Sequence, residues 1–405
     1  MNENFYKEFI SFKSIFYFCS LPLRLDSYKG CSFGCLYCFS QKVNNRKAGF
    51  FTNIIPADPR KLKIRFENLV NNKRISSSVI NSCLIRKIPI HFGSVSDPFQ
   101  PHEEKYRVTQ ELLKILLEFN YPTVISTKSK LIIEKPYIDL IKKFPVVVQI
   151  SFSTFENELS RKLEPNAPSP KERLNTLDFL AKNGFSTVAR IQPFLYLNCK
   201  NLEEDIHTLY KSGVKHIIFE HLRIPTNSPL NIREQLWKNI GINYLNEYKK
   251  AGMKISRINY ELNVEMKIQT VLLAKKICHH YGISFGSGDN DLHHFSDSFC
   301  CCGLKNCTGF ENLYDGHLNS IAHDAILTGK IDISIIKNKW QPEGSIREFL
   351  NSDCRREKLI TVKDYLESRI GNNKISNSLS NFYGIEFDPE KGYYIDKGTI
   401  EKNIF

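Results

Sequence analysis

The sequence contains no apolar run that could cross a lipid bilayer. A membrane-spanning helix needs about 20 consecutive apolar residues, and no stretch of this 405-residue chain approaches that length. Residues 5–25 are apolar in patches, but Lys7, Lys13 and Arg24 interrupt them, so we expect no cleaved signal peptide. The chain also lacks internal repeats and long low-complexity linkers. These absences exclude a membrane span and a repeat array, and favour a soluble globular protein.

Cysteine pairs with the spacing of a secreted, disulfide-stabilised domain are also missing. The twelve cysteines of the chain are unevenly distributed, which suits a reducing compartment where thiolates bind metals instead of forming crosslinks. We therefore expect a cytoplasmic protein. Its length allows one large domain with an accessory region, or two ordinary domains.

Acidic residues are fewer than basic ones, and the formal net charge is +13. Residues 41–90 contain eleven Lys and Arg but only two acidic residues, Asp58 and Glu67. A basic region of this kind can attract a polyanion such as nucleic acid. The alternative is a compositional bias, because the whole chain is rich in Lys, Asn and Ile.

Three cysteines occur close together at C-x3-C-x2-C spacing: Cys31, Cys35 and Cys38. Three thiolates from one loop can hold three corners of a [4Fe-4S] cluster and leave the fourth iron without a protein ligand. Gly30 and Gly34 allow the tight backbone curvature that this requires. A structural zinc site would need a fourth Cys or His nearby, and none follows at finger-like spacing.

Short β-branched runs alternate with amphipathic segments from Leu21 to about Arg223. This pattern predicts six strands, at 21–28, 88–94, 122–128, 146–154, 186–194 and 216–223. It also predicts helices at 103–119, from Pro170 to Gly184, at about 232–251 and at 261–282, with a capping box at Ser169-Pro-Lys-Glu172. Six βα units indicate an α/β fold, a partial (β/α)6 TIM-type barrel with its sites at the C-terminal ends of the strands.

We predict four regions along the chain. They are an N-terminal extension (1–20), the core barrel (21–225), a helical completion of the core (226–288) and a C-terminal accessory region (289–405), which is rich in polar and turn residues.

The cysteine loop resembles the signature loop of the radical SAM superfamily. The resemblance implies that S-adenosylmethionine (SAM) binds the open iron and that an electron cleaves it to a 5'-deoxyadenosyl radical, which abstracts hydrogen from a substrate. It also implies an electron donor such as a flavodoxin or ferredoxin. The carboxylate of SAM needs a cation, and its ribose needs polar partners. The candidate cofactor-binding residues near the strand ends are Ser94, Ser96, Asp97, Lys128, Ser151, Arg161, Arg190 and Gln192.

Three further stretches resemble the spore photoproduct lyase-like branch, also called DNA repair photolyases: 91–102, 125–129 and 159–168. The resemblance covers residues 21–196 and implies that Lys128 and Ser151 approach SAM. It implies that Arg161, Glu164 and Pro165 shape the cofactor pocket. Where the lyase has a cysteine that donates hydrogen, this chain has Ser94, so dimer reversal by that route is not expected.

A second group of cysteines lies in the accessory region: Cys300, Cys301, Cys302 and Cys307, with His293 and His294 upstream. The group could bind an auxiliary Fe-S cluster or zinc, or supply a thiol that quenches a radical. Adjacent side chains diverge, and buried packing is the more common role of such cysteines.

These observations predict a radical SAM enzyme whose substrate is DNA, RNA or a nucleotide. The sequence identifies no individual catalytic residue. Two alternatives remain: radical modification of a protein or peptide, and a non-catalytic Fe-S sensor that binds nucleic acid.

Overall fold

An eight-stranded sheet forms the centre of the molecule. The computed structural model describes residues 5–41, 49–71, 78–225, 241, 243–255, 259–328, 338–350, 361–369, 385–388 and 392–395. The strands are β1 (Ile10–Phe12), β2 (Leu23–Leu25), β5 (Ile90–Phe92), β6 (Thr123–Thr127), β7 (Val146–Phe152), β8 (Thr187–Phe194), β9 (His216–His221) and β13 (Ser284–Ser287), in spatial order β1-β2-β5-β6-β7-β8-β9-β13. Every neighbouring pair from β2 to β13 is parallel, which confirms the predicted partial TIM-type barrel.

The six strands predicted from the sequence are present as β2, β5, β6, β7, β8 and β9. The two outer strands were not predicted. Strand β1 lies in the presumed N-terminal extension and pairs antiparallel with β2, so this segment belongs to the barrel sheet. Strand β13 pairs with β9 and adds a seventh parallel strand, within the region predicted to complete the core with helices.

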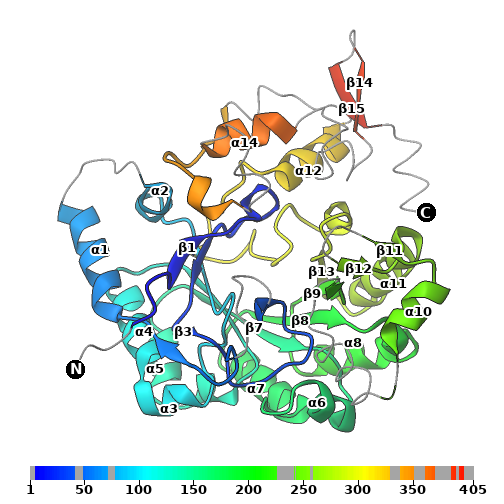
Figure 1. Ribbon diagram of the computed structural model, residues 1–405, viewed down its shortest axis with the longest axis horizontal. Helices are drawn as coiled ribbons and strands as arrows, with labels where there is room; N and C mark the ends of the chain where they lie inside the picture. Colours follow the sequence, from blue (N-terminus) through cyan, green and yellow to red (C-terminus); the bar gives the residue numbers. More distant parts are fainter. Residues whose placement is uncertain are drawn as a thin grey trace.

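Helices lie around the outside of the sheet (Figure 1). They are α1 (Pro59–Asn71), α2 (Val79–Ile85), α3 (His102–Tyr106), α4 (Val108–Glu118), α5 (Tyr137–Ile141), α6 (Asn157–Leu163), α7 (Pro170–Lys182), α8 (Leu202–Lys211), α10 (Tyr244–Lys250), α11 (Val264–His280), α12 (Leu318–Thr328) and α14 (Val362–Arg369). Three small sheets complete the described structure: β3 (Tyr28–Lys29) with β4 (Ile55–Pro56), β10 (Ile224–Pro225) with β12 (Asn259–Glu261) and β11 (Lys254–Ile255), and β14 (Ile385–Asp388) with β15 (Gly392–Ile395). None of the helices in the described ranges is both long and apolar enough to cross a membrane.

The helix signals in the sequence mostly hold. Helix α7 begins with the predicted capping box, in which Ser169 and Glu172 satisfy each other's backbone N–H groups. The predicted helix 103–119 is divided into α3 and α4, because Arg107 adopts a left-handed conformation with φ 54°. The prediction at 261–282 corresponds to α11, while much of 232–251 lies outside the described residues.

The interior of the barrel has an apolar base at the N-terminal ends of the strands. One apolar residue near the start of each of β6, β7, β8 and β9 packs together with Leu21: Val124, Val147, Val188 and Ile218. Cys300, Cys302, Leu304 and Phe310, from the segment after β13, pack onto the same cluster. The accessory region therefore closes the base of the barrel.

The accessory region also contacts the segment between β1 and β2. Asn319 at the start of α12 donates a hydrogen bond to the carbonyl of Phe18 (2.7 Å), and Ser20 Oγ lies 2.8 Å from His317 Nε2. Figure 1 shows α12 and α14 together along one side of the barrel. The accessory region thus covers the N-terminal ends of the strands. We therefore look for a functional site at their C-terminal ends.

Candidate functional site

The cysteine loop follows the short strand β3 and ends in the 3-10 turn Phe39–Gln41. Gly30 and Gly34 both have positive φ angles, 94° and 68°. A Cβ atom on Gly30 would lie 2.7 Å from the carbonyl oxygen of Phe50, so only glycine fits there. The two glycines bend the chain so that Cys31, Cys35 and Cys38 come from one compact loop, as the sequence predicted.

The segment after β5 anchors the first half of this loop. Gln100 accepts a hydrogen bond from the Ser32 amide (2.8 Å) and donates one to the carbonyl of Gly30 (3.1 Å). Gln100 is fully buried, so these bonds do not compete with water. The segment that resembles the lyase-like branch therefore positions the cysteine loop directly.

The end of α6 and the residues that follow it anchor both halves of the loop. The Leu36 amide donates to the carbonyl of Leu163 (2.9 Å), and the Asn166 side chain donates to the carbonyl of Ser32 (2.9 Å). Two sequence stretches that are far apart along the chain, one with Gln100 and one with Leu163 and Asn166, thus hold one cysteine loop.

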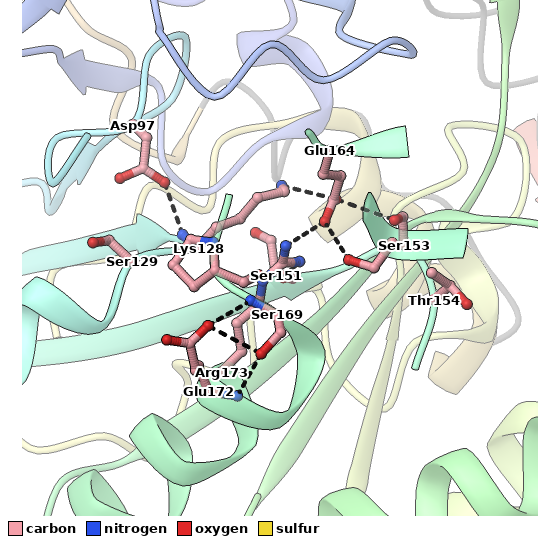
Figure 2. Close-up of polar contacts among 12 residues, drawn as sticks. Asp97, Lys128, Ser129, Ser151, Ser153, Thr154, Glu164, Ser169, Glu172 and Arg173 are labelled. Carbon is pink, nitrogen blue, oxygen red and sulfur yellow. Dashed lines mark hydrogen bonds and ion pairs between the residues drawn. The ribbon is translucent and has the colours of Figure 1, made fainter. Parts of the chain in front are cut away.

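Behind the loop lies a buried group of charged and polar side chains, shown in Figure 2. The Glu164 carboxylate accepts hydrogen bonds from Tyr37, Ser153 and Arg173. Lys128 Nζ lies 3.8 Å from Glu164 Oε1. Burial would raise the pKa of Glu164, but Arg173 and Lys128 outweigh it and hold that pKa below its usual range. The group fixes Tyr37, which belongs to the cysteine loop.

Burial favours the protonated form of the loop thiols. It raises the pKa of Cys31 to about 12 and that of Cys35 well above its usual range, while Lys128 acts on Cys35 in the opposite direction. Metal binding would displace these protons, because the thiolate is the form that ligates a metal. Within the described residues, no three His, Cys, Asp or Glu side chains converge closely enough to hold one metal ion. The ligands of a cubane bind different irons and need not converge on one atom, so the donor set fits the implied cluster.

Two predicted cofactor residues hold the backbone around the site. Asp97 accepts hydrogen bonds from Thr127 Oγ1, from the Lys128 amide (both 2.7 Å) and from the Phe99 amide (3.0 Å). Ser96 Oγ donates to the carbonyl of Tyr28 (2.6 Å). These contacts tie the ends of β5 and β6 to the strand that precedes the cysteine loop.

Arg190 and Gln192 lie in a hydrogen-bonded chain across the barrel interior. Arg190 Nη1 donates to Gln149 Oε1 (2.7 Å), and Nη2 donates to Gln192 Oε1. Gln192 in turn donates to Glu220. Because a guanidinium group has no acceptor, Arg190 fixes the orientation of both amides. Its hydrogen bonds run to other side chains of the barrel interior.

The other predicted residues are distributed more widely. Ser151 is half-buried on β7, and its carbonyl accepts a hydrogen bond from Arg173 (3.0 Å). Ser94 is half-buried just after β5. Arg161 is exposed on α6. The arginine that pairs with Glu164 is Arg173 of α7. Sequence reasoning missed Arg173, although it shares the buried helical spacing of Leu177 and Leu180.

The basic region is only partly available to a polyanion. Lys42, Arg46, Lys47, Lys73 and Arg74 lie outside the described residues. Arg60 pairs with Asp58 (2.9 Å), and Lys63 pairs with Glu118 (3.2 Å) and Glu67 (3.9 Å). The Arg86 guanidinium lies over the Trp340 ring, 4.5 Å from its centre. In the described part of this region, acidic side chains and an aromatic ring already contact much of the positive charge.

No family model matches the chain. An uncharacterised protein of Methanocaldococcus jannaschii is 28% identical over 176 residues, which are 42% of this chain and 60% of that protein. A protein of Pseudomonas phage M6, named radical SAM Nα-GlyT isomerase, is 24% identical over 226 residues, which are 55% of this chain and 44% of that protein. The chain thus spans about half the length of these curated relatives.

Two solved structures of spore photoproduct lyase variants superpose on the chain with TM-scores of 0.51 and 0.52. The superpositions cover 68% and 69% of this chain and 79% of each lyase chain, at 16% and 15% sequence identity. The chain has the fold of spore photoproduct lyase. The resemblance predicted from the sequence motifs is therefore confirmed at the level of fold. Because one fold hosts many reactions, the chemistry depends on the residues at the mouth of the barrel.

Proposed function

We propose that the protein is a radical SAM enzyme in which Cys31, Cys35 and Cys38 hold a [4Fe-4S] cluster. The observation that carries the proposal is the placement of the three-thiol loop. It lies at the C-terminal ends of the parallel strands, where Gln100, Leu163 and Asn166 hold it by hydrogen bonds. A site at this end of a barrel is where enzymes of such folds act.

The cluster and SAM, when bound, would supply a 5'-deoxyadenosyl radical after one-electron reduction by a donor such as a flavodoxin or ferredoxin. The residues of the chain position and shield them. Lys128 supplies positive charge beside Cys35, and Ser151 lies at the end of β7 where a ribose can hydrogen-bond. Phe33, which is buried, and Tyr37, which Glu164 holds, limit access of water to the loop.

We propose nucleic acid or a nucleotide as the substrate class. The support is the basic excess of residues 41–90 together with the neighbouring fold, since spore photoproduct lyase has been solved in complex with dinucleoside spore photoproduct. Ser94 lies where a cysteine hydrogen donor was expected from the resemblance. A serine O–H is a poor hydrogen-atom donor, so the proposed reaction is a different hydrogen abstraction, not dimer reversal by a thiol at that position.

The test is 5'-deoxyadenosine formation by anaerobically reconstituted, dithionite-reduced protein with SAM. Iron and sulfide contents and the EPR spectrum of the reduced protein establish the cluster. Production that single-stranded or duplex nucleic acid stimulates would support both the chemistry and the substrate class. Stimulation should fall steeply as salt rises, because phosphate contacts release counterions. An intact cluster with no SAM cleavage would contradict the proposal of a radical SAM enzyme and favour an Fe-S sensor that binds nucleic acid.

Cys35→Ala tests the cluster ligands, and Cys83→Ala is its matched control. The Cys35→Ala substitution removes one ligand and should abolish both the EPR signal of the cluster and 5'-deoxyadenosine formation. Cys83→Ala removes an equally free but fully buried thiol on α2 and should leave cluster assembly intact. If Cys35→Ala still cleaves SAM, the assignment of the cluster ligands is wrong.

A further inference from the structure

A layer of polar side chains crosses the interior of the barrel between its apolar base and its mouth. On β7, Val147, Gln149 and Ser151 occupy alternate positions and therefore share one face of the strand. Val147 packs in the apolar base, so this face points into the barrel. The register pairs Ser151 with Arg190 of β8, and both residues are half-buried. Gln149 thus lies directly above the base, and Ser151 and Arg190 lie above it, at the floor of the mouth.

The direction of the hydrogen bonds in this layer is fixed from both ends. Lys13 Nζ lies 2.8 Å from His91 Nδ1 and can only donate, so the ring hydrogen is on Nε2, which donates to Ser126 Oγ (2.7 Å). Burial, with Lys13 and Arg190 adding to it, holds the pKa of His91 well below its usual range, so the ring is neutral. Ser126 Oγ donates to Gln149 Oε1 (2.9 Å), and Arg190 Nη1 donates to the same oxygen (2.7 Å).

The amide nitrogen of Gln149 is left without an acceptor. Gln149 is 0% exposed, and its Nε2 has no hydrogen-bond partner among the residues that the structure describes. Turning the amide over would not help, because it would place the NH2 group against the Arg190 guanidinium, which cannot accept. A buried donor without a partner destabilises the protein. This layer of the barrel therefore lacks one acceptor.

The same layer has a positive charge without a carboxylate partner. The Arg190 guanidinium has five N–H donors, and its hydrogen bonds run to the neutral amides of Gln149 and Gln192. Glu220 accepts a hydrogen bond from Gln192 and pairs with Arg223 (2.9 Å). In the described part of the chain, Arg190 forms no ion pair. The missing acceptor and the unpaired charge lie side by side, and an anion would supply both.

We infer that Arg190, Gln149 and Ser151 bind an oxyanion of the substrate, a carboxylate or a phosphate, at the floor of the mouth. Arg190 Nη1 and Gln149 Nε2 flank the shared oxygen Oε1, so a ligand oxygen that contacts the guanidinium also lies beside the unpartnered amide nitrogen. Ser151 adds a hydroxyl group from the open side. The assignment of the oxyanion to the substrate rests on the proposed function, whereas its binding does not.

The position of Arg190 in the sheet separates this subsite from the cysteine loop. Lys128, at the end of β6, is the cation that acts on Cys35. Strand β7 lies between β6 and β8, which carries Arg190. A cation for the cofactor is therefore present beside the cysteine loop, and Arg190 is available for a group of the substrate.

The experiment is calorimetric titration of the full-length, anaerobically reconstituted protein with inorganic phosphate and, in a second arm, with acetate. SAM is left out, and the ionic strength is kept constant with chloride. We expect saturable binding of at least one anion at one site per chain, and the stronger arm identifies phosphate or carboxylate. No saturable binding in either arm would overturn the inference.

Two arms exclude binding at the cluster and at the cofactor site. Cys35→Ala, which should not assemble the cluster, should bind the same anion with an unchanged Kd, so the result is independent of radical chemistry. Loss of binding in this variant would place the anion on the open iron and contradict the subsite. S-adenosylhomocysteine carries the same carboxylate as SAM and should not displace the anion. Displacement would assign Arg190 to the cofactor.

Gln149→Glu tests the subsite most directly. The substitution keeps the shape of the side chain and places a carboxylate oxygen where the unpartnered nitrogen lies, next to Arg190. The Kd for the anion should rise about tenfold or more, since a charge-assisted pair now occupies the guanidinium. The urea midpoint of the metal-free protein should rise as well. An unchanged Kd or a lower midpoint would refute the assignment.

Two further variants complete the comparison. Arg190→Met removes the charge and should weaken anion binding as strongly as Gln149→Glu, without the gain in stability. Lys128→Met removes a cation from the other side of the mouth and should leave the Kd unchanged. Equal weakening by both variants would show a general effect of positive charge and would overturn the specific subsite.

Discussion

The buried ion pair between Glu164 and Arg173 offers the strongest test of how the site is held together. Both side chains are 0% exposed. Arg173→Met keeps most of the side-chain volume but leaves the Glu164 carboxylate with Tyr37, Ser153 and Lys128, whose Nζ is 3.8 Å away. Removing one partner of a buried pair costs about 3–5 kcal/mol. Because Lys128 remains, we expect the lower end, about 3 kcal/mol, or roughly a hundredfold rise in the unfolded fraction.

The assay is urea unfolding of the metal-free protein, with Lys130→Met as the matched control. Lys130 pairs with Glu172 at 2.9 Å at the start of the same helix, but the two side chains are 56% and 40% exposed. An exposed pair contributes less than about 1 kcal/mol. Equal losses from the two variants would refute the reasoning. The double variant Glu164→Gln/Arg173→Met should be more stable than Arg173→Met, since it leaves no buried carboxylate without its arginine.

The same pair predicts a pH dependence. The pKa of Glu164 is lower in the folded protein than its ordinary value of 4.5, although burial alone would raise it. Its contribution to stability is therefore complete above the unfolded pKa and is lost as the pH falls through the folded pKa. The stability difference between wild type and Glu164→Gln should stay constant from neutrality to about pH 5 and shrink in stronger acid. A difference that widens toward low pH would contradict this.

Three further changes test the loop, its supports and the far wall of the barrel. Gly30→Ala introduces a Cβ atom 2.7 Å from the Phe50 carbonyl and should lower iron incorporation severalfold. Gly184 also has a positive φ, 81°, but no atom lies within 4 Å of the position of an added Cβ. Gly184→Ala should therefore cost only about 1–2 kcal/mol of stability. The Asp97 carboxylate accepts hydrogen bonds from three donors, and in Asp97→Asn the new NH2 group would face at least one of them. The free energy of unfolding measured in urea should therefore fall by about 1–3 kcal/mol. Burial raises the pKa of Glu220 to about 7. Nucleic-acid-stimulated SAM cleavage should therefore change near neutral pH in wild type but not in Glu220→Gln, with unstimulated cleavage as the control.

Strands β6, β7, β8 and β9 were predictable because each contains several buried β-branched residues. Strand β1 (Ile10–Phe12) escaped prediction because it takes its strand form from pairing with β2, a contact that the local sequence does not show. Strand β13 contains Gly286, whose missing side chain makes room for the Cys301 carbonyl. A glycine in a four-residue run weakens the strand signal, so its place in the sheet depends on tertiary packing.

The cysteine loop was visible from spacing alone, but the contacts that hold it were not. Glu164 and Arg173 are nine positions apart, and their pairing depends on how α6 and α7 meet. For the basic region, the sequence alone overstated the unpaired positive charge. The count included only residues 41–90, whereas Lys63 pairs with Glu118 of α4, which the fold brings beside it.

The mouth of the barrel carries two groups of charged side chains. On the side of β5, β6 and β7, Asp97, Lys128, Glu164 and Arg173 bind the backbone and one another, and the result is a rigid seat for the cysteine loop. On the side of β8, β9 and β13, Arg223 pairs with Glu220 (2.9 Å), and Asp289 lies 2.7 Å from His221 Nδ1. A cofactor that every turnover reuses benefits from a rigid seat. On the proposed function, we therefore expect the first group to hold the cofactor and the second, which includes Glu220, to select the substrate.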